Sequence, residues 1–240
     1  MALLGTLSPI SLRLSLTVLL VAIPAPLAAQ QSSAFEGTWE VAGSLEDGSS
    51  PYQGSTRIRA ENGAFFVEAE AGEIRLSGIG MMDGDSLFVG LGSWTRGAKA
   101  VGIFSYALLP DGVLDGRWFS IDGQGVGYEK GVSGGHEGLV GSYQVQGRGP
   151  GNSGAYRGTL TISNRTPGYW FDWDLGKLKY RGIGIEHAGQ YYSSWCITGV
   201  CILARYQIAG ETLEGSLLRS DSPLTQKEKL TRIISPQATP

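Results

Sequence analysis

Two stretches of the sequence share one pattern, which indicates how the fold is built. "RLSGIGMMDGDSLFV" runs from Arg75 to Val89, and "KYRGIGIEHAGQYYS" runs from Lys179 to Ser193. In both, Gly-Ile-Gly follows a polar/apolar alternation, and a turn then leads into an aliphatic or aromatic strand. The two stretches lie 104 residues apart, which indicates that one unit has been copied.

The rest of the chain repeats in the same way. "FEGTWEV" from Phe35 matches "LVGSYQV" from Leu139, and "YQGSTRI" from Tyr52 matches "YRGTLTI" from Tyr156, both again at 104. Later matches have shorter spacings, as small deletions in loops would produce: Trp94 with Trp195 at 101, Tyr106 with Tyr206 at 100, and Glu129-Lys130 with Glu228-Lys229 at 99.

These spacings predict a tandem duplication of a unit of about 95 residues, joined by the Gly-rich segment "GVSGGHEG". The expected organisation is a signal peptide at 1–29, a first β-barrel repeat at 30–130, a linker at 131–138, a second β-barrel repeat at 139–233 and a C-terminal tail at 234–240.

The N-terminal segment has the features of a secretory signal peptide. One positive charge, Arg13, precedes an apolar run from Leu14 to Ile23, and the small residues "PAPLAA" follow. The run is shorter than the roughly 20 residues that span a bilayer, so no membrane span is expected after its removal. A buried N-terminal helix is the alternative. The predicted location is therefore secreted or periplasmic.

The composition of the chain argues against some classes of binding partner. The net charge of the chain is −3, which gives no basic surface for nucleic acid and no polybasic membrane patch. The 37 glycines, together with abundant Trp and Tyr in regular alternation, are typical of many short strands joined by tight turns.

Strand counting predicts the architecture. Each unit holds eight short strands separated by turns such as "ENG", "MDGD" and "LPDG", in which glycine supplies a positive φ. We therefore expect an all-β protein with two tandem antiparallel eight-stranded up-and-down barrels, which have no exposed edges. A single larger barrel or a two-sheet sandwich is the alternative.

The only two cysteines, Cys196 and Cys201, lie in "SSWCITGVCILARY". In a secreted chain they predict a disulfide, with "ITGV" as a hairpin loop between adjacent strands. Free thiols or a metal site are the alternatives, but no His or further Cys lies nearby in the sequence, so no metal is expected.

Alternation assigns the inner face of the strands. It places Phe65, Val67, Ala69 and Ala71 inside the first unit, and Tyr169, Phe171, Trp173 and Leu175 at the matching positions of the second. The two alanines predict more free volume in the first barrel. Glu68, Glu70, Asp172 and Asp174 are then expected outside, which argues against a glycosidase.

Aromatic residues are the remaining candidates for a site. Aromatic interiors can bind a small apolar ligand or can pack as a filled core, and both readings stay open. The candidate barrel-interior ligand-binding residues are Trp39, Phe65, Trp94, Tyr106, Trp118, Tyr169, Trp173, Trp195 and Tyr206. Trp170 alternates away from Trp173, so it is the candidate for contact with a partner.

The pattern also resembles known families. The "GTW" start at Gly37 and the eight-strand meander are similar to calycins, the lipocalins and avidins. The repeats look more like small secreted bacterial β-barrel proteins, on "GSYQV" from Gly141, "YRGT" from Tyr156, the Tyr169–Trp173 strand, Gly182-Ile183-Gly184 and "LEG" from Leu213. Some of those are labelled fibronectin-binding. The resemblance implies a secreted barrel and names no binding residue.

Two histidines, His136 and His187, lie in a linker and a turn, so a catalytic triad is not expected and no cofactor is predicted. The sequence therefore predicts an exported non-enzymatic binding protein for a small hydrophobic molecule or an extracellular or cell-surface protein. The alternatives are a cofactor-free barrel enzyme, such as an isomerase or cyclase of the allene-oxide-cyclase type, and a purely structural or adhesive module. A buried Glu or Arg among the aromatics would favour the enzyme.

Overall fold

The computed structural model describes residues 32–93, 101–123, 125–197 and 199–234. Within these ranges the chain folds into sixteen strands, a helical turn at 32–35 and a short 3-10 helix, Pro150–Asn152. The strands form two closed antiparallel eight-stranded barrels, which confirms the predicted fold class. The signal-peptide segment lies outside the described residues.

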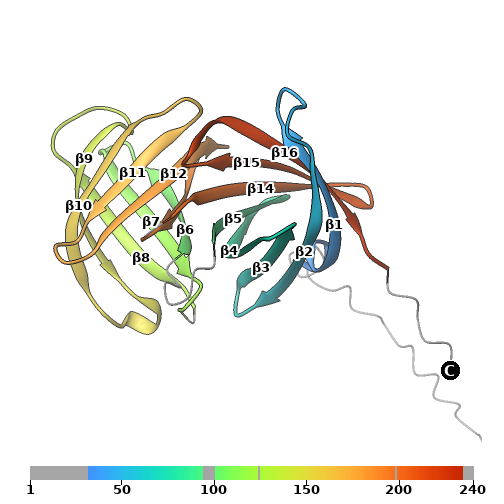
Figure 1. The fold of residues 1–240 in the computed structure, drawn as a ribbon. Helices are drawn as coiled ribbons and strands as arrows, with labels where there is room; N and C mark the ends of the chain where they lie inside the picture. The colour runs from blue at the N-terminus through green and yellow to red at the C-terminus, as the bar shows by residue number, and fades with distance from the viewer. Residues whose placement is uncertain (1–31, 94–100, 124, 198, 235–240) are drawn as a thin grey trace, which may run out of the picture.

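The two barrels lie side by side (Figure 1). We name them the split barrel and the inserted barrel. The split barrel consists of β1 (Gly37–Leu45), β2 (Tyr52–Glu61), β3 (Ala64–Ala71), β4 (Ile74–Asp83), β5 (Ser86–Ser93), β14 (Cys201–Ala209), β15 (Thr212–Arg219) and β16 (Ser222–Arg232). The inserted barrel consists of β6 (Val101–Leu108), β7 (Val113–Ser120), β8 (Gly127–Ser133), β9 (Gly141–Arg148), β10 (Tyr156–Asn164), β11 (Tyr169–Asp174), β12 (Lys179–His187) and β13 (Gln190–Cys196).

The sequence repeats do not coincide with the barrels. β5 pairs with β14, with Val89 opposite Ala204, and β13 pairs with β6, with Ser193 opposite Phe104. Each barrel therefore combines five strands of one repeat with three of the other. The expectation that 30–130 and 139–233 each close a barrel is wrong. The inserted barrel is a continuous meander from β6 to β13, placed between β5 and β14.

Strand register also corrects one detail of the repeat. Val89 pairs with Gly80, and Ser193 pairs with Gly184, so the spacing of 104 persists through β5 and β13. Trp195 is therefore equivalent to Leu91 and not to Trp94, which lies outside the described residues. Tyr106 and Tyr206 do occupy equivalent positions, opposite Gly116 and Gly215.

The turn residues and the inward and outward alternation of side chains along the strands agree with the sequence-based predictions. Asn62 and Gly63 both have positive φ, at 52° and 79°, which is the two-residue turn that joins antiparallel strands with the correct twist. Phe65 and Val67 point into the split barrel, whereas Glu68 is exposed on its outer face. The period of two is therefore sufficient to sort the walls into inside and outside.

A third apolar cluster joins the barrels. The rings of Phe88 and Tyr192 stack with centroids 3.6 Å apart, and the Tyr192 hydroxyl donates a hydrogen bond to Asp83 across the interface. Ile79 and Ile183, from the two Gly-Ile-Gly segments, are fully buried in this cluster. The chain crosses from one barrel to the other after β5 and again after β13. The outer faces of the strands near these two crossovers are apolar because they form a core between the barrels.

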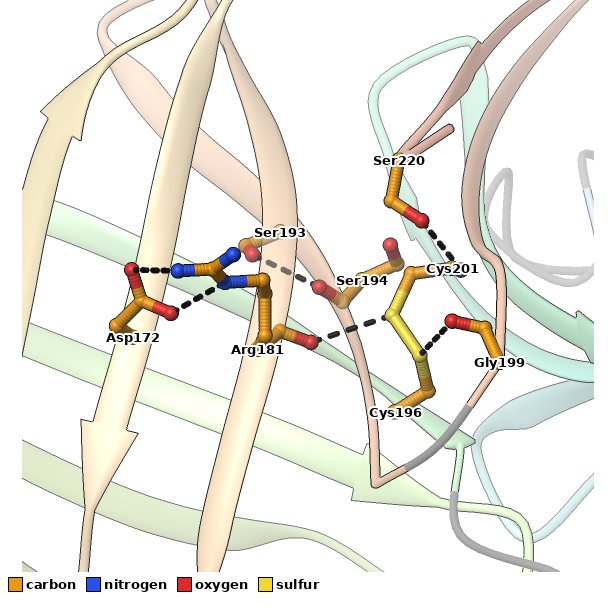
Figure 2. The surroundings of a disulfide bond; sticks show 8 residues. All are labelled: Asp172, Arg181, Ser193, Ser194, Cys196, Gly199, Cys201 and Ser220. Carbon is orange, nitrogen blue, oxygen red and sulfur yellow. Dashed lines mark hydrogen bonds and ion pairs between the residues drawn. A yellow bond between two sulfur atoms is a disulfide. The ribbon is translucent and has the colours of Figure 1, made fainter. Parts of the chain in front are cut away.

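The disulfide lies at one of the two crossovers. Cys196 ends β13 in the inserted barrel and Cys201 begins β14 in the split barrel, with Cα atoms 5.8 Å apart (Figure 2). The Cys201 amide donates a hydrogen bond to Ser220 Oγ at 3.0 Å. The predicted disulfide is confirmed, but the predicted hairpin is wrong, because β13 and β14 pair with strands of different barrels.

Each barrel is closed at the end where β1 or β9 begins. In the split barrel, Trp39 Nε1 donates to the carbonyl oxygen of Phe35 at 3.1 Å, and the Arg232 guanidinium lies 4.2 Å from the Trp39 ring centroid. In the inserted barrel, the Tyr143 hydroxyl donates to the carbonyl oxygen of Leu139 at 2.8 Å. The cavities described next open at the other end.

Candidate ligand cavities

Each barrel contains a cavity that opens at one end. The volume is about 400 Å³ in the inserted barrel and about 420 Å³ in the split barrel. The turns between β11 and β12 and between β3 and β4 form part of the rims, where Leu178 and Ile74 are exposed at 51% and 55%. These two aliphatic residues are equivalent in the repeat, so both mouths present the same apolar feature.

The cavity of the inserted barrel has a buried carboxylate at its wall. Glu129 on β8 is 1% exposed, and its Oε1 accepts hydrogen bonds from the Tyr106 hydroxyl at 2.5 Å and from Trp173 Nε1 at 3.2 Å. Glu129 Oε2 has no partner with hydrogen-bond geometry among the described residues. The Tyr156 hydroxyl approaches the same carboxyl group and lines the cavity with it.

The split barrel has the same arrangement at equivalent positions. Glu228 on β16 accepts hydrogen bonds from the Tyr52 hydroxyl at 2.6 Å and from the Tyr206 hydroxyl at 2.9 Å. Both carboxylate oxygens therefore have a tyrosine partner. Arg219 also lines this cavity, while its guanidinium forms a two-point ion pair with Asp221 at 2.9 and 2.8 Å.

Burial controls the ionisation of these groups. Removal from water raises the pKa of Glu129 and of Glu228, and the hydrogen bonds that they accept oppose this shift only in part. Burial, together with the neighbouring carboxylate, also raises the pKa of Tyr106 and of Tyr206 well above the ordinary value. A carboxyl group that holds its proton more tightly, in an apolar cavity, can act as a hydrogen-bond donor or as a general acid.

The walls of the two cavities differ in chemistry. Trp118, Trp173 and Trp195 line the inserted barrel, and strand register places Leu217, Ala69 and Leu91 at the equivalent positions of the split barrel. Two more lining residues, Phe104 and Tyr180, are equivalent to Ala204 and Leu76. The inserted barrel is therefore aromatic where the split barrel is aliphatic.

The predicted difference in free volume is not found. Ala69 and Ala71 line the cavity of the split barrel, as alternation implied, but the two cavities are almost equal in size. The smaller wall residues of the split barrel, Ala69, Ala204 and Leu217, therefore do not give it a larger cavity.

The predicted interior residues fall into three groups. Trp118, Trp173 and Trp195 line a cavity, and Tyr106 and Tyr206 hold its carboxylate. The other described members lie away from the cavities: Trp39 and Phe65 pack at the closed end of the split barrel, and Tyr169 packs edge-on against Tyr191. Trp94 lies outside the described residues.

Trp170 points to the outer face, as predicted, but it is only partly exposed. Its ring lies between the guanidinium groups of Arg165 and Arg181, each 5.1 Å from the ring centroid, and packs against the inter-barrel cluster. The expectation of a freely exposed tryptophan is wrong, because this part of the outer face of β11 packs against the apolar cluster between the two barrels.

The sequence reasoning missed the carboxylates. Glu129 and Glu228 were recognised only as a repeated Glu-Lys pair, although alternation in "GYEKG" places Glu129 inside with Gly127 and Gly131. The same charged residue points inward in both copies of the repeat, and this pattern could have predicted the buried carboxyl group. The outward carboxylates behave as expected, since Asp172 and Asp174 pair with Arg181 and Lys179 at 2.6 and 2.7 Å.

Comparison with known proteins found no matching family model, no matching curated protein and no matching solved structure. The resemblance to calycins and to small secreted barrel proteins therefore stays a prediction. Within the described residues, no group of three or more His, Cys, Asp or Glu side chains could hold a metal ion. Over the same residues, no helix has the length and apolar character needed to cross a membrane.

Proposed function

We propose that the protein is an exported binding protein that holds a small, mainly apolar ligand in one or both barrel cavities. One observation carries the proposal: each barrel has a cavity of about 400 Å³, open at one end, with a carboxyl group on its wall that is buried at Glu129 and half-buried at Glu228. Cavities of this size, mostly apolar and with few polar groups, are typical of small-molecule sites.

Export is part of the same proposal. The charged, apolar and small-residue order of the first 29 residues motivates it, and the disulfide at Cys196 and Cys201 is compatible with an oxidising compartment such as the periplasm or the extracellular space. Export would bring the protein into contact with extracellular small molecules.

A fluorescent apolar probe tests the binding proposal. N-phenyl-1-naphthylamine should bind the full chain with enhanced emission and with two sites. Ala69→Trp, which introduces the tryptophan of the inserted barrel into the split barrel, should reduce the stoichiometry to one. Glu68→Trp places the same side chain on the outer face one residue away and should leave two sites. Absence of probe binding to the wild type would overturn the proposal.

A cofactor-free enzyme is the second candidate. It is favoured by Glu129, a carboxyl group whose pKa is raised by burial and which faces an aromatic cavity. The two functions differ in the fate of a bound compound. A binding protein returns it unchanged after incubation, whereas an isomerase or cyclase returns a product of the same mass with a different chromatographic retention time.

A further inference from the structure

Each cavity has a glutamate on its wall, buried at Glu129 and half-buried at Glu228, but the two glutamates differ in their neighbours. In the split barrel, Arg219 lines the cavity together with Glu228, and both carboxylate oxygens of Glu228 accept tyrosine hydroxyls. In the inserted barrel, no Lys or Arg is among the described residues that line the cavity. Ser120 stands at the position equivalent to Arg219, opposite Gly102 as Arg219 is opposite Ile202.

Glu129 is also the less satisfied of the two. Its Oε1 has two donors, Tyr106 and Trp173, and the side chain is 1% exposed. The Tyr156 hydroxyl approaches the same carboxyl group, but Oε2 has no partner with hydrogen-bond geometry among the described residues. A buried carboxylate oxygen without a donor is unfavourable in free energy, and a ligand that donates a hydrogen bond or carries a positive charge would remove that cost.

The surrounding rings provide a second attraction for positive charge. Phe104 and Trp173 stack with centroids 5.0 Å apart, and Tyr180 packs edge-on against Trp195 at 4.9 Å, so two aromatic pairs line the cavity. The faces of such rings carry partial negative charge and attract ammonium groups. The five aromatic positions that differ from the split barrel therefore add ring faces that attract a cation, while Trp118 Nε1 and Trp195 Nε1 are buried donors without an acceptor among the described residues.

From these observations we infer that the cavity of the inserted barrel binds an organic cation, specifically a small amine with an apolar body, whose ammonium group lies against Glu129. The apolar body packs among Trp118, Trp173 and Tyr180. The split barrel, in which both carboxylate oxygens of Glu228 already accept tyrosine hydroxyls and the wall is aliphatic, does not share this preference. The inference rests on the proposed function, since it names the ligand class of one of the two cavities.

Calorimetric titration of the full chain at near-neutral pH with a matched pair of probes tests it. 2-Phenylethylamine and 2-phenylethanol differ chiefly in the charged group. The amine should bind about tenfold or more tightly than the alcohol, since only the amine pairs its charge with the carboxylate and the rings. Glu129→Gln should remove this difference. Asp115→Asn, on the exposed face of the same barrel, should retain it.

A second variant keeps the test decisive if Glu129→Gln does not fold. Trp118→Leu introduces the residue of the split barrel and should weaken the amine more than the alcohol. Equal affinities of the two probes for the wild type, or an amine preference that survives in Glu129→Gln, would overturn the inference. If neither probe binds but the apolar naphthylamine does, only this inference fails. If none of the three binds, the proposed function fails as well.

Discussion

Glu129 and Glu228 occupy equivalent positions in the two barrels, and each accepts a hydrogen bond from the equivalent buried tyrosine, Tyr106 or Tyr206. A carboxylate inside a small barrel is unfavourable unless it is paired or used, because burial removes its hydration. Its presence in both copies of the repeat makes this glutamate and its tyrosines the shared framework of the two cavities. Differences around that framework then set what each cavity can hold.

The tyrosine partners should be important for stability. Tyr106 is fully buried, and Tyr106→Phe removes the 2.5 Å hydrogen bond to Glu129 without creating a large cavity. We expect a loss of about 1–3 kcal/mol in the free energy of unfolding, because a buried carboxylate loses a donor. Urea denaturation followed by tryptophan fluorescence measures it. Tyr128→Phe, on the exposed face of β8, is the control and should change stability by less than about 0.5 kcal/mol.

The pH dependence of stability should reveal the buried glutamates. Because burial raises the pKa of Glu129, the folded protein binds that proton more tightly than the unfolded chain does. The stability from this group is complete below the unfolded pKa, about 4.3, and is lost as the pH rises through the higher folded value. In Glu129→Gln, stability relative to the wild type should therefore increase as the pH rises above about 4.3.

Glu68→Gln is the matched control, since Glu68 lies on the exposed outer face. Its stability difference from the wild type should stay nearly constant over the same pH range. A constant difference for Glu129→Gln as well would contradict a raised pKa at that position.

The barrel interface should be sensitive to one glycine. A Cβ atom on Gly90 would lie 2.2 Å from the carbonyl oxygen of Gly102 in the other barrel, whereas a Cβ on Gly92 would meet Val101 at 3.5 Å, an ordinary contact. Gly90→Ala should force the barrels apart and should destabilise the protein by about 1–3 kcal/mol, the range found for overpacked cores. Gly92→Ala should be tolerated. Thermal unfolding of the two variants, with small-angle scattering for the shape, distinguishes these outcomes.

The disulfide should stabilise the protein modestly and should not define the arrangement of the barrels. It links residues only five positions apart, so the entropy that it removes from the unfolded chain corresponds to about 2 kcal/mol. The apolar cluster around Phe88 and Tyr192 holds the barrels together independently. The double variant Cys196→Ala and Cys201→Ala should keep the radius of gyration of the wild type. An expanded radius would show that the crossover depends on the bond.

The sequence predicts local structure well because alternation and turn chemistry are local. The period of two placed Phe65 inside and Glu68 outside, and Asn62-Gly63 predicted its turn. It could not predict which copy closes which barrel. β6 and β14 are equivalent in the repeat, so β5 could pair with either strand, and local alternation and turn chemistry do not distinguish the two pairings.

The candidate site was only half predicted for a related reason. Trp118, Trp173 and Trp195 were identified because large aromatics with inward alternation are conspicuous. Glu129 was not, since an ionisable residue is ordinarily solvated and its inward position had to be weighed against that expectation. Trp170 was misjudged because alternation separates inner from outer faces, but does not reveal that part of the outer face lies against a second barrel.

Native mass spectrometry of the purified full chain, before and after extraction with organic solvent, tests most directly whether the barrels hold a ligand. We predict one or two bound small molecules per chain before extraction, their loss afterwards, and an accompanying shift in tryptophan emission from the rings that line the inserted barrel. A compound with a protonated amine would match the cavity that contains Glu129. The mass of the bare chain in both preparations, with an unchanged emission spectrum, would contradict the account.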